Sequence, residues 1–204
     1  AFIYDAFNRL VKVKVGTVVL ATYQYDALNR RVLKAIDSNI DGTVDYTIKY
    51  LYAGFRCLEE LDGNDNLIKE FVFGGLYQDE IILQKSGATE YYFTHDERYS
   101  VTSLINAIGG IVESYDYKVY GERTASGAGL AEIGYTGQRH DKEATGLMYF
   151  KNRYYSPIMG QFITKDPMGY VNGMSMYQGY FGAQGKDPFG YYDEEGHYYT
   201  TYLV

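Results

Sequence analysis

The sequence contains little cysteine and proline, no tryptophan and no long apolar run. Its single cysteine, Cys57, excludes an internal disulfide and leaves no CxxC pair for redox chemistry or zinc. We therefore expect Cys57 to be a small buried apolar residue. No apolar segment approaches the roughly 18 residues that a membrane-spanning helix needs, so we predict no membrane span.

Positive charge is also scarce. The chain has 19 Lys and Arg against 26 Asp and Glu, a net charge of −7. Nucleic acids and anionic membrane surfaces both attract a basic face, so neither partner is expected. The three histidines, His95, His140 and His197, are too scattered for metal-ligand spacing, and no phosphate-binding loop is present. We expect no cofactor.

Tyrosine and glycine are abundant, with 25 Tyr, 10 Phe and 23 Gly. This composition favours strands joined by glycine turns. Short stretches such as Thr22–Tyr25, Ile48–Tyr52 and Glu90–Phe93 alternate at period two, which is typical of half-buried strands. On such strands we expect the tyrosine rings to pack while their hydroxyl groups stay solvated.

A repeat of about 21 residues organises the N-terminal part. Residues Tyr4–Val11 align with Tyr25–Val32, and looser echoes follow downstream. A unit of this size cannot bury its apolar face alone, so neighbouring units must stack into a continuous sheet. We expect Asp5 and Asp26 to accept hydrogen bonds from turn amides and to pair with Arg9 and Arg30.

Turn residues separate the strand patterns. Asp41-Gly42, Asp62-Gly63, Gly74-Gly75 and Gly109-Gly110 lie where hairpins should reverse. Helical spacing is weak throughout, with short helical turns expected only near 137–145 and 173–177. The sequence therefore predicts an all-β fold, built as a ribbon of β-hairpins laid side by side.

One loop has the oxygen spacing of a calcium site. Asp37, Asn39, Asp41 and Asp45 occupy positions 1, 3, 5 and 9 of an EF-hand-like loop, with a glycine at position 6. Position 12 is Ile48 rather than Glu, and no amphipathic helices flank the loop. An Asx-rich turn between two strands has the same composition, so both interpretations are open.

The C-terminal part contains the same four-residue turn twice, at Asp166–Gly169 and Asp187–Gly190. Asp, Pro and Gly at positions one, two and four are what a type I turn prefers. An Arg153-Tyr154-Tyr155 sequence precedes the first copy. One such turn is easily explained by local structure, but a repeated frame with an upstream arginine indicates a site.

These residues together resemble the YD-repeat, or Rhs-repeat, family and its repeat-associated core domain. The matching segments are Tyr25–Arg30, Tyr135–Arg139, Glu143–Tyr149, Asn152–Tyr155, Gly160–Ile163 and the two DPxG turns. The resemblance implies that the ribbon spirals into a hollow shell that encloses a C-terminal toxic polypeptide. Teneurins of animal cell surfaces use a related shell.

The resemblance also divides the chain. It implies a YD-repeat ribbon over 1–130, the core domain over 131–190 and a C-terminal extension or stub over 191–204. Because the chain opens inside a repeat unit at Ala1–Asp5, we expect it to be a fragment of a larger protein. The expected location is extracellular or at a cell surface. The expected partners are the chain's own C-terminal cargo, neighbouring repeats and a secretion or toxin-complex partner, or glycans.

In this family the core domain is similar to an aspartate protease that cuts its own chain just beyond the second DPxG turn. The resemblance implies that Asp166 and Asp187 are the catalytic carboxylates and Arg153 the supporting cation. Gln161 stands where the family usually has Arg, and the interval between the two turns is about two residues shorter than usual. Two interpretations are therefore open: a self-cleaving shell module, or a non-catalytic extracellular scaffold or adhesin.

Overall fold

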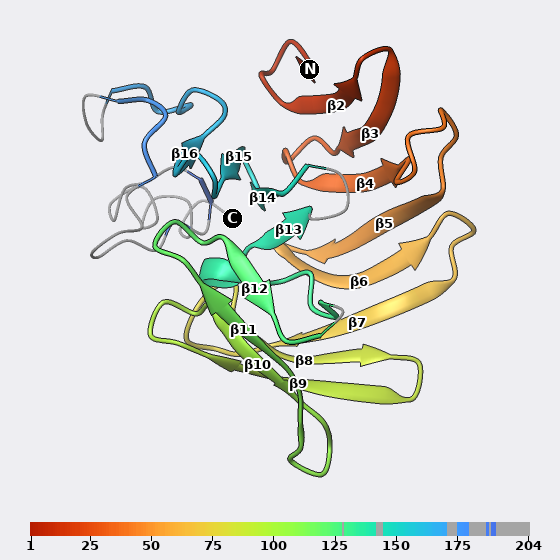
Figure 1. Cartoon of the computed structure of the whole chain (residues 1–204), viewed down its shortest axis with the longest axis vertical. Helices are drawn as coiled ribbons and strands as arrows, with labels where there is room; N and C mark the ends of the chain where they lie inside the picture. Colours follow the sequence, from red (N-terminus) through yellow and green to blue (C-terminus); the bar gives the residue numbers. More distant parts are fainter. Residues whose placement is uncertain (128, 142–144, 171–174, 180–186, 188, 191–204) are drawn as a thin grey trace.

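The computed structural model describes residues 1–127, 129–141, 145–170, 175–179, 187 and 189–190. Within these residues the fold consists of two antiparallel sheets (Figure 1). The larger sheet, called the wall, contains β1 (Phe2–Tyr4), β2 (Leu10–Val15), β3 (Val18–Tyr25), β4 (Arg31–Ile36), β5 (Tyr46–Ala53), β6 (Arg56–Asp62), β7 (Leu67–Phe73), β8 (Ile81–Ser86), β9 (Thr89–His95), β10 (Val101–Ile105), β11 (Ile111–Tyr117) and β12 (Arg123–Ala125).

The smaller sheet, called the inner sheet, follows a 3₁₀ turn, η1 (Tyr135–Gly137). Its strands are β13 (Arg139–Asp141), β14 (Leu147–Phe150), β15 (Arg153–Ser156) and β16 (Gln161–Phe162). In Figure 1 the wall is one curved layer, and the inner sheet lies on the side towards which it curves. The domain boundary expected near residue 130 falls between β12 and η1 and stays a prediction. The expected extension at 191–204 lies outside the described residues.

Wall strands pair in sequence order, so the wall is a meander of hairpins, as predicted. Its repeat turns fold as expected from their aspartates. The Asp5 Oδ1 accepts hydrogen bonds from the amides of Phe7 and Arg9, both at 2.9 Å, and its other oxygen accepts from the Arg9 side chain. Asp26 and Arg30 repeat this arrangement 21 residues later.

The glycine-containing reversals predicted at residues 41–42, 62–63, 74–75 and 109–110 all fall in connections between or at the ends of wall strands. The helical turn predicted over 137–145 was wrong for Arg139–Asp141, which form β13. These three residues pair with β14 and are all buried, so tertiary packing determines their conformation. The helical turn expected near 173–177 falls partly outside the described residues.

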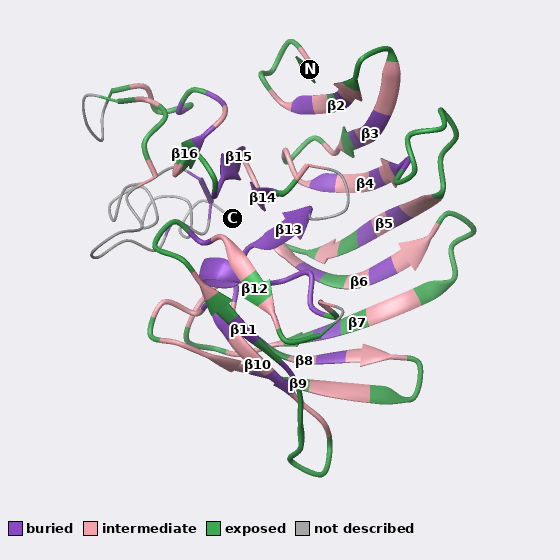
Figure 2. Cartoon of the chain, in the orientation of Figure 1, coloured by how far each residue is buried: buried purple, intermediate pink, exposed green. Residues whose placement is uncertain are grey.

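The apolar contact between the two sheets involves mainly β2–β4 of the wall. Leu147, Tyr149 and Tyr154 of the inner sheet pack against Leu10 and Ile36. Figure 2 shows the buried residues concentrated in the inner sheet and on the wall strands beside it. Cys57 is buried, as expected. No helix in the described part of the chain has the length and apolar character to span a membrane.

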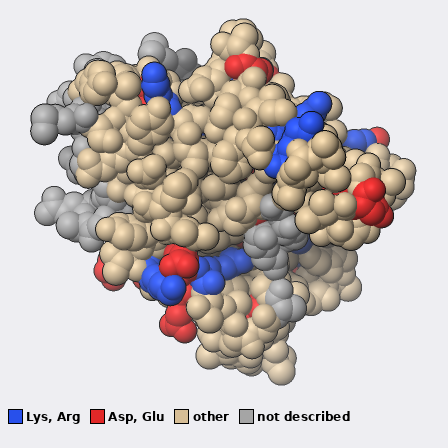
Figure 3. Space-filling view, turned by 45° about the horizontal axis from the view of Figure 1, so that its top comes forward, with Lys and Arg blue, Asp and Glu red and all other residues tan. Residues whose placement is uncertain are grey.

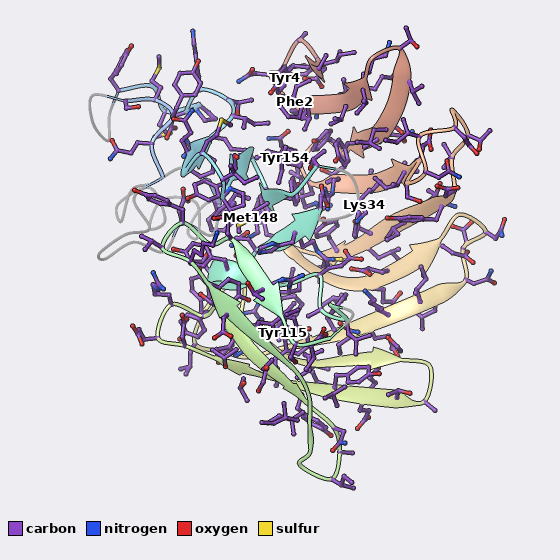
Figure 4. The ribbon with its side chains drawn as sticks, viewed as in Figure 1. Phe2, Tyr4, Lys34, Tyr115, Met148 and Tyr154 are labelled. Atoms are coloured by element: carbon purple, nitrogen blue, oxygen red, sulfur yellow. The ribbon has the colours of Figure 1, made fainter. Side chains whose placement is uncertain are left out.

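Buried charges also join the two sheets. Arg31 of β4 is fully buried and contacts Asp141 of β13 at 2.5 Å, while Lys34 lies 3.6 Å from Asp141 and from Glu132. Arg139 of β13 pairs with Glu60 of the wall. Figure 4 labels Lys34 on the wall and Tyr154 and Met148 on the inner sheet. Together these ion pairs fix how the inner sheet docks on the wall.

Several tyrosine hydroxyls belong to this network, contrary to the expectation that they stay solvated. Tyr154 and Tyr50 accept hydrogen bonds from the Arg31 guanidinium at 3.1 and 3.3 Å, and the Tyr149 hydroxyl accepts one from the Arg31 amide. The Tyr149 ring centroid lies 4.4 Å from the guanidinium carbon. Rings and hydroxyls thus replace part of the water that the buried cation has lost.

Burial by itself would raise the pKa of Glu132. The neighbouring Lys34, Lys69 and Arg139 outweigh burial and lower the pKa to about 2. A carboxyl with a depressed folded-state pKa stabilises the fold above its unfolded-state pKa, and this contribution is lost as the pH falls towards 2. The docking of the two sheets is therefore supported electrostatically at neutral pH.

Replacing Arg31 by Met in the full-length protein is expected to lower the free energy of unfolding by about 3–5 kcal/mol, because Asp141 then keeps a buried charge without its closest partner. The adjacent Arg30→Met is the matched control. It removes a partly exposed pair with Asp26 and is expected to cost less than about 1 kcal/mol. Denaturant unfolding measures both losses, and equal losses would contradict this account.

Candidate functional site

The first DPxG turn folds locally and is anchored to the chain that follows it. The Gly169 amide donates to the Asp166 carbonyl at 3.0 Å, and the Met168 amide donates to the Asp166 Oδ1 at 2.8 Å. The Asp166 amide in turn donates to the Met176 carbonyl. The turn therefore leaves the second carboxylate oxygen of Asp166 available for contacts inside the molecule.

Arg153 brings the three predicted site residues together. It lies on β15, all of whose residues are buried, and its guanidinium carbon is 3.6 Å from the centroid of the Phe162 ring. The Arg153 Nη2 lies 3.0 Å from the Asp166 Oδ2 and 3.5 Å from the Asp187 Oδ2. One buried cation thus contacts both DPxG carboxylates, and the shortened interval between the turns does not keep either from reaching it.

Arg153 makes a further contact that the sequence did not predict. Its Nε donates a hydrogen bond of 2.5 Å to the carbonyl oxygen of Gly190, the last residue of the second DPxG turn. That oxygen belongs to the peptide bond that follows Gly190, and the family resemblance implies a cut just beyond this turn. The guanidinium therefore holds two carboxylates and a backbone carbonyl at one point.

Glycine is required at position 190 for two reasons. Its φ of +69° lies in the left-handed region, and a Cβ there would lie 2.8 Å from the Phe150 carbonyl oxygen and 3.4 Å from the Arg153 nitrogen. Gly169, the equivalent residue of the first turn, has a φ of +72° but no atom near its missing Cβ. The second turn is thus closely packed against the β14–β15 hairpin, whereas the first is open.

Burial raises the pKa of Asp166, and the negative charge of Asp187 raises it further. The hydrogen bond from Met168 and the positive charge of Arg153 oppose these effects without cancelling them. Asp166 therefore keeps its proton to a higher pH than a carboxyl in water. This is the behaviour of the proton-holding member of a carboxylate pair.

Asp166 borders a groove of about 800 Å³ between the first DPxG turn and the repeat turns of the wall. Lys165, Asp166 and Pro167 line one side, and residues of the turns at 7–9 and 25–29 line the other. Gln161, where the family usually has Arg, is exposed on β16 and does not line this groove. The groove is large enough to admit water or an extended peptide to Asp166.

The candidate calcium loop has the geometry of an Asx turn. The Asp37 carboxylate accepts hydrogen bonds from the amides of Asp41 and Gly42, and Asp45 accepts from the amide and hydroxyl of Ser38. In the described part of the chain, no group of three or more His, Cys, Asp or Glu side chains is arranged to hold a metal ion. The loop oxygens, including that of Asn39, are directed to neighbouring amides.

The meander of repeat hairpins and the paired DPxG turns together define a segment of a YD-repeat shell. The chain belongs to the Teneurin YD-shell family, whose model matches residues 1–179. This confirms the resemblance stated from the sequence. Family membership and fold establish the shell architecture, while the roles of Arg153, Asp166 and Asp187 stay predictions.

Two relatives and one solved structure illustrate the range of similar proteins. The tRNA nuclease WapA of Bacillus subtilis strain 168 is 26% identical over 205 residues, which cover 97% of this chain and 8% of WapA. Toxin subunit YenC1 of Yersinia entomophaga is 29% identical, over 77% of this chain and 18% of YenC1. The crystal structure of TcdB2-TccC3 superposes with a TM-score of 0.68 at 19% identity, over 93% of this chain and 10% of that one. The chain thus spans less than a fifth of each of these proteins.

Gly190→Ala is expected to move the second DPxG turn off the β14–β15 hairpin, because the added Cβ would collide with the Phe150 carbonyl. Amide hydrogen exchange of residues 150–155 in the full-length protein should then become faster. The matched control is Gly169→Ala, which carries only the left-handed strain of roughly 1–2 kcal/mol and should leave that exchange unchanged. Identical exchange in both variants would show that the close packing at Gly190 has no structural consequence.

Proposed function

We propose that this chain is part of a YD-repeat shell that encloses a C-terminal polypeptide, and that Arg153 of its inner sheet and the two DPxG turns form an aspartate-type self-protease. The observation that carries the proposal is the joint contact of Arg153 with Asp166, Asp187 and the Gly190 carbonyl. A structural turn residue needs no such convergence. The chain itself delivers the peptide to be cut, so proximity replaces substrate binding.

In the proposed reaction, water attacks the carbonyl carbon of Gly190 while Asp187 accepts a proton from it. The Arg153 guanidinium stabilises the negative charge that develops on the Gly190 oxygen. Asp166 supplies a proton to the departing amide nitrogen, in keeping with its raised pKa. The products are a carboxylate at Gly190 and a free amine on the residue that follows.

The names of the relatives support a toxin-related setting. WapA is named as a tRNA nuclease and YenC1 as a toxin subunit, and this chain is similar to a small part of each. We infer an extracellular or cell-surface location, with the chain's own C-terminal polypeptide as cargo and a toxin-complex or secretion protein as partner. On the face drawn in Figure 3, the basic side chains lie in small groups, some of them directly beside acidic side chains. We propose no nucleic-acid partner for the shell segment because the net charge of the chain is −7.

Asp166→Asn in the full-length protein is expected to abolish cleavage after Gly190, because the amide can neither hold nor donate the acidic proton. Intact-mass measurement should give two polypeptides for the unaltered protein and one for the variant. Asp62→Asn, in an exposed wall turn, is the matched control and should be cut normally.

Two results would contradict the proposal. If the unaltered full-length protein has a single uncut mass, the DPxG aspartates are turn residues and the chain is a non-catalytic scaffold. If Asp166→Asn is cut at the same bond and to the same extent, another agent makes the cut.

The rate of cleavage should depend on pH in a defined direction. Since catalysis needs Asp166 protonated, the first-order rate should fall as the pH rises through its raised folded-state pKa. Full-length protein made in a short cell-free synthesis can be diluted into buffers between pH 4 and 8 and followed by mass. A rate that rises across this range would assign the protonated role to some other group.

A further inference from the structure

The tip of the β14–β15 hairpin lies against the second DPxG turn. Lys151 and Asn152 form its two-residue loop, between Phe150 and Arg153. The Asn152 Nδ2 donates a hydrogen bond of 2.9 Å to the carbonyl of Phe189, and the Lys151 Nζ lies 5.1 Å from the centroid of the Phe189 ring. The peptide unit immediately before Gly190 is therefore held by this hairpin loop.

The hairpin loop is itself strained. Lys151 has a φ of +57°, in a region that glycine or asparagine occupies far more readily in a two-residue hairpin. For a lysine this conformation costs roughly 1–2 kcal/mol. Its Nζ contacts both carboxylate oxygens of Asp79 at 2.7 Å, and Asp79 belongs to the wall. The wall thus retains a lysine in the conformation that brings it over Phe189.

Two more wall turns contact the hairpin loop and the second DPxG turn. The Asn29 Nδ2 donates a hydrogen bond of 2.7 Å to the Asn152 Oδ1, which orients the amide that holds Phe189. The Phe55 ring meets the Phe189 ring edge-on, with centroids 5.3 Å apart and planes at 83°. Figure 1 shows the β14–β15 region beside this edge of the wall.

The three contacts come from three consecutive turns on one edge of the wall. Asn29 lies in the turn between β3 and β4, Phe55 between β5 and β6, and Asp79 between β7 and β8. In an antiparallel meander every second turn falls on the same edge, so these contacts exist together only when six wall strands are paired in register.

We propose that these three wall turns position the second DPxG turn, with Asn29, Phe55 and Asp79 as positioning residues. The Gly190 carbonyl then reaches Arg153 only after the wall has formed and the inner sheet has docked on it. The positioning of the turn is independent of catalysis, but the statement about cleavage rests on the self-protease function proposed above. Self-cleavage would then follow the pairing of β3 to β8, and a polypeptide joined to a chain whose wall strands have not paired would not be released.

Asn29→Gly tests the first contact with little disturbance of the backbone, because glycine tolerates the φ of +64° found there. The matched control is Asn8→Gly. Asn8 occupies the same position in the preceding repeat turn with a φ of +62°, and in the described part of the chain no hydrogen bond joins its side chain to Asn152. In full-length protein from cell-free synthesis, Asn29→Gly should slow cleavage about tenfold or more, and Asn8→Gly should leave the rate unchanged. Equal rates for the two variants would overturn the proposal.

A second measurement does not depend on cleavage. In the Asp166→Asn background, hydrogen exchange of the amides of Phe189 and Gly190 should be about tenfold faster with Asn29→Gly than with Asn8→Gly. Phe55→Leu, which removes the ring contact, should have an effect in the same direction. Equal exchange in the Asn29 and Asn8 variants would overturn the proposal even if Asp166 is catalytic. If Asp166→Asn fails to stop cleavage, the proposed protease fails, and this exchange measurement still decides whether the wall positions the turn.

Discussion

A permanently charged guanidinium can be buried only where carboxylates, carbonyl oxygens and aromatic rings replace its water. Two centres in this molecule meet that requirement. Arg31 satisfies it with Asp141 and a group of tyrosines, which fixes how the inner sheet docks on the wall. Arg153 satisfies it with two aspartates, the Gly190 carbonyl and the ring of Phe162. The first centre is closed by neighbours from both sheets, whereas the second includes a backbone carbonyl at the end of a turn.

The two centres differ in where the carboxylate partners of the arginine lie in the fold. The carboxylates nearest to Arg31 and Arg139, those of Asp141 and Glu60, come from strands whose places are fixed by pairing, so these charges stabilise one arrangement of the two sheets. The carboxylates around Arg153 come from turns, and a groove of about 800 Å³ leads to one of them. Burial raises the pKa of Asp166, which favours a shared proton. Similar physical chemistry therefore fixes the docking of the two sheets at one centre and, at the other, gives the arrangement on which the proposed self-protease is based.

The sequence predicted what is decided locally. The Asp–Arg repeat turns, the glycine reversals and the alternating strands depend on residues within a few positions of one another, and they fold as expected. The family motif also identified Arg153, Asp166 and Asp187, which lie together in the structure. It did not predict the contact between Arg153 and the Gly190 carbonyl. Arg30 and Arg31 are adjacent in sequence, yet only Arg31 is fully buried, because the inner sheet covers it from more than 100 residues away. The strand β13 was missed for the same reason, since its conformation depends on pairing with β14.

The contacts around Phe189 show why the remainder of the site could not be found from the sequence. The hairpin loop at Lys151 and Asn152 carries no glycine signal in the sequence, and nothing local indicates the wall turns that it contacts. In the sequence Asn29 is an ordinary residue of the repeat turn. Asparagine tolerates the left-handed backbone conformation found there, with a φ of +64°, so its presence needs no further explanation. Only the side-by-side placement of alternate wall turns gives its amide a partner 123 residues away. Asn29 is thus both part of the repeat turn and, in our proposal, a positioning residue. The strained Lys151 lies next to Asn152, the residue that Asn29 contacts.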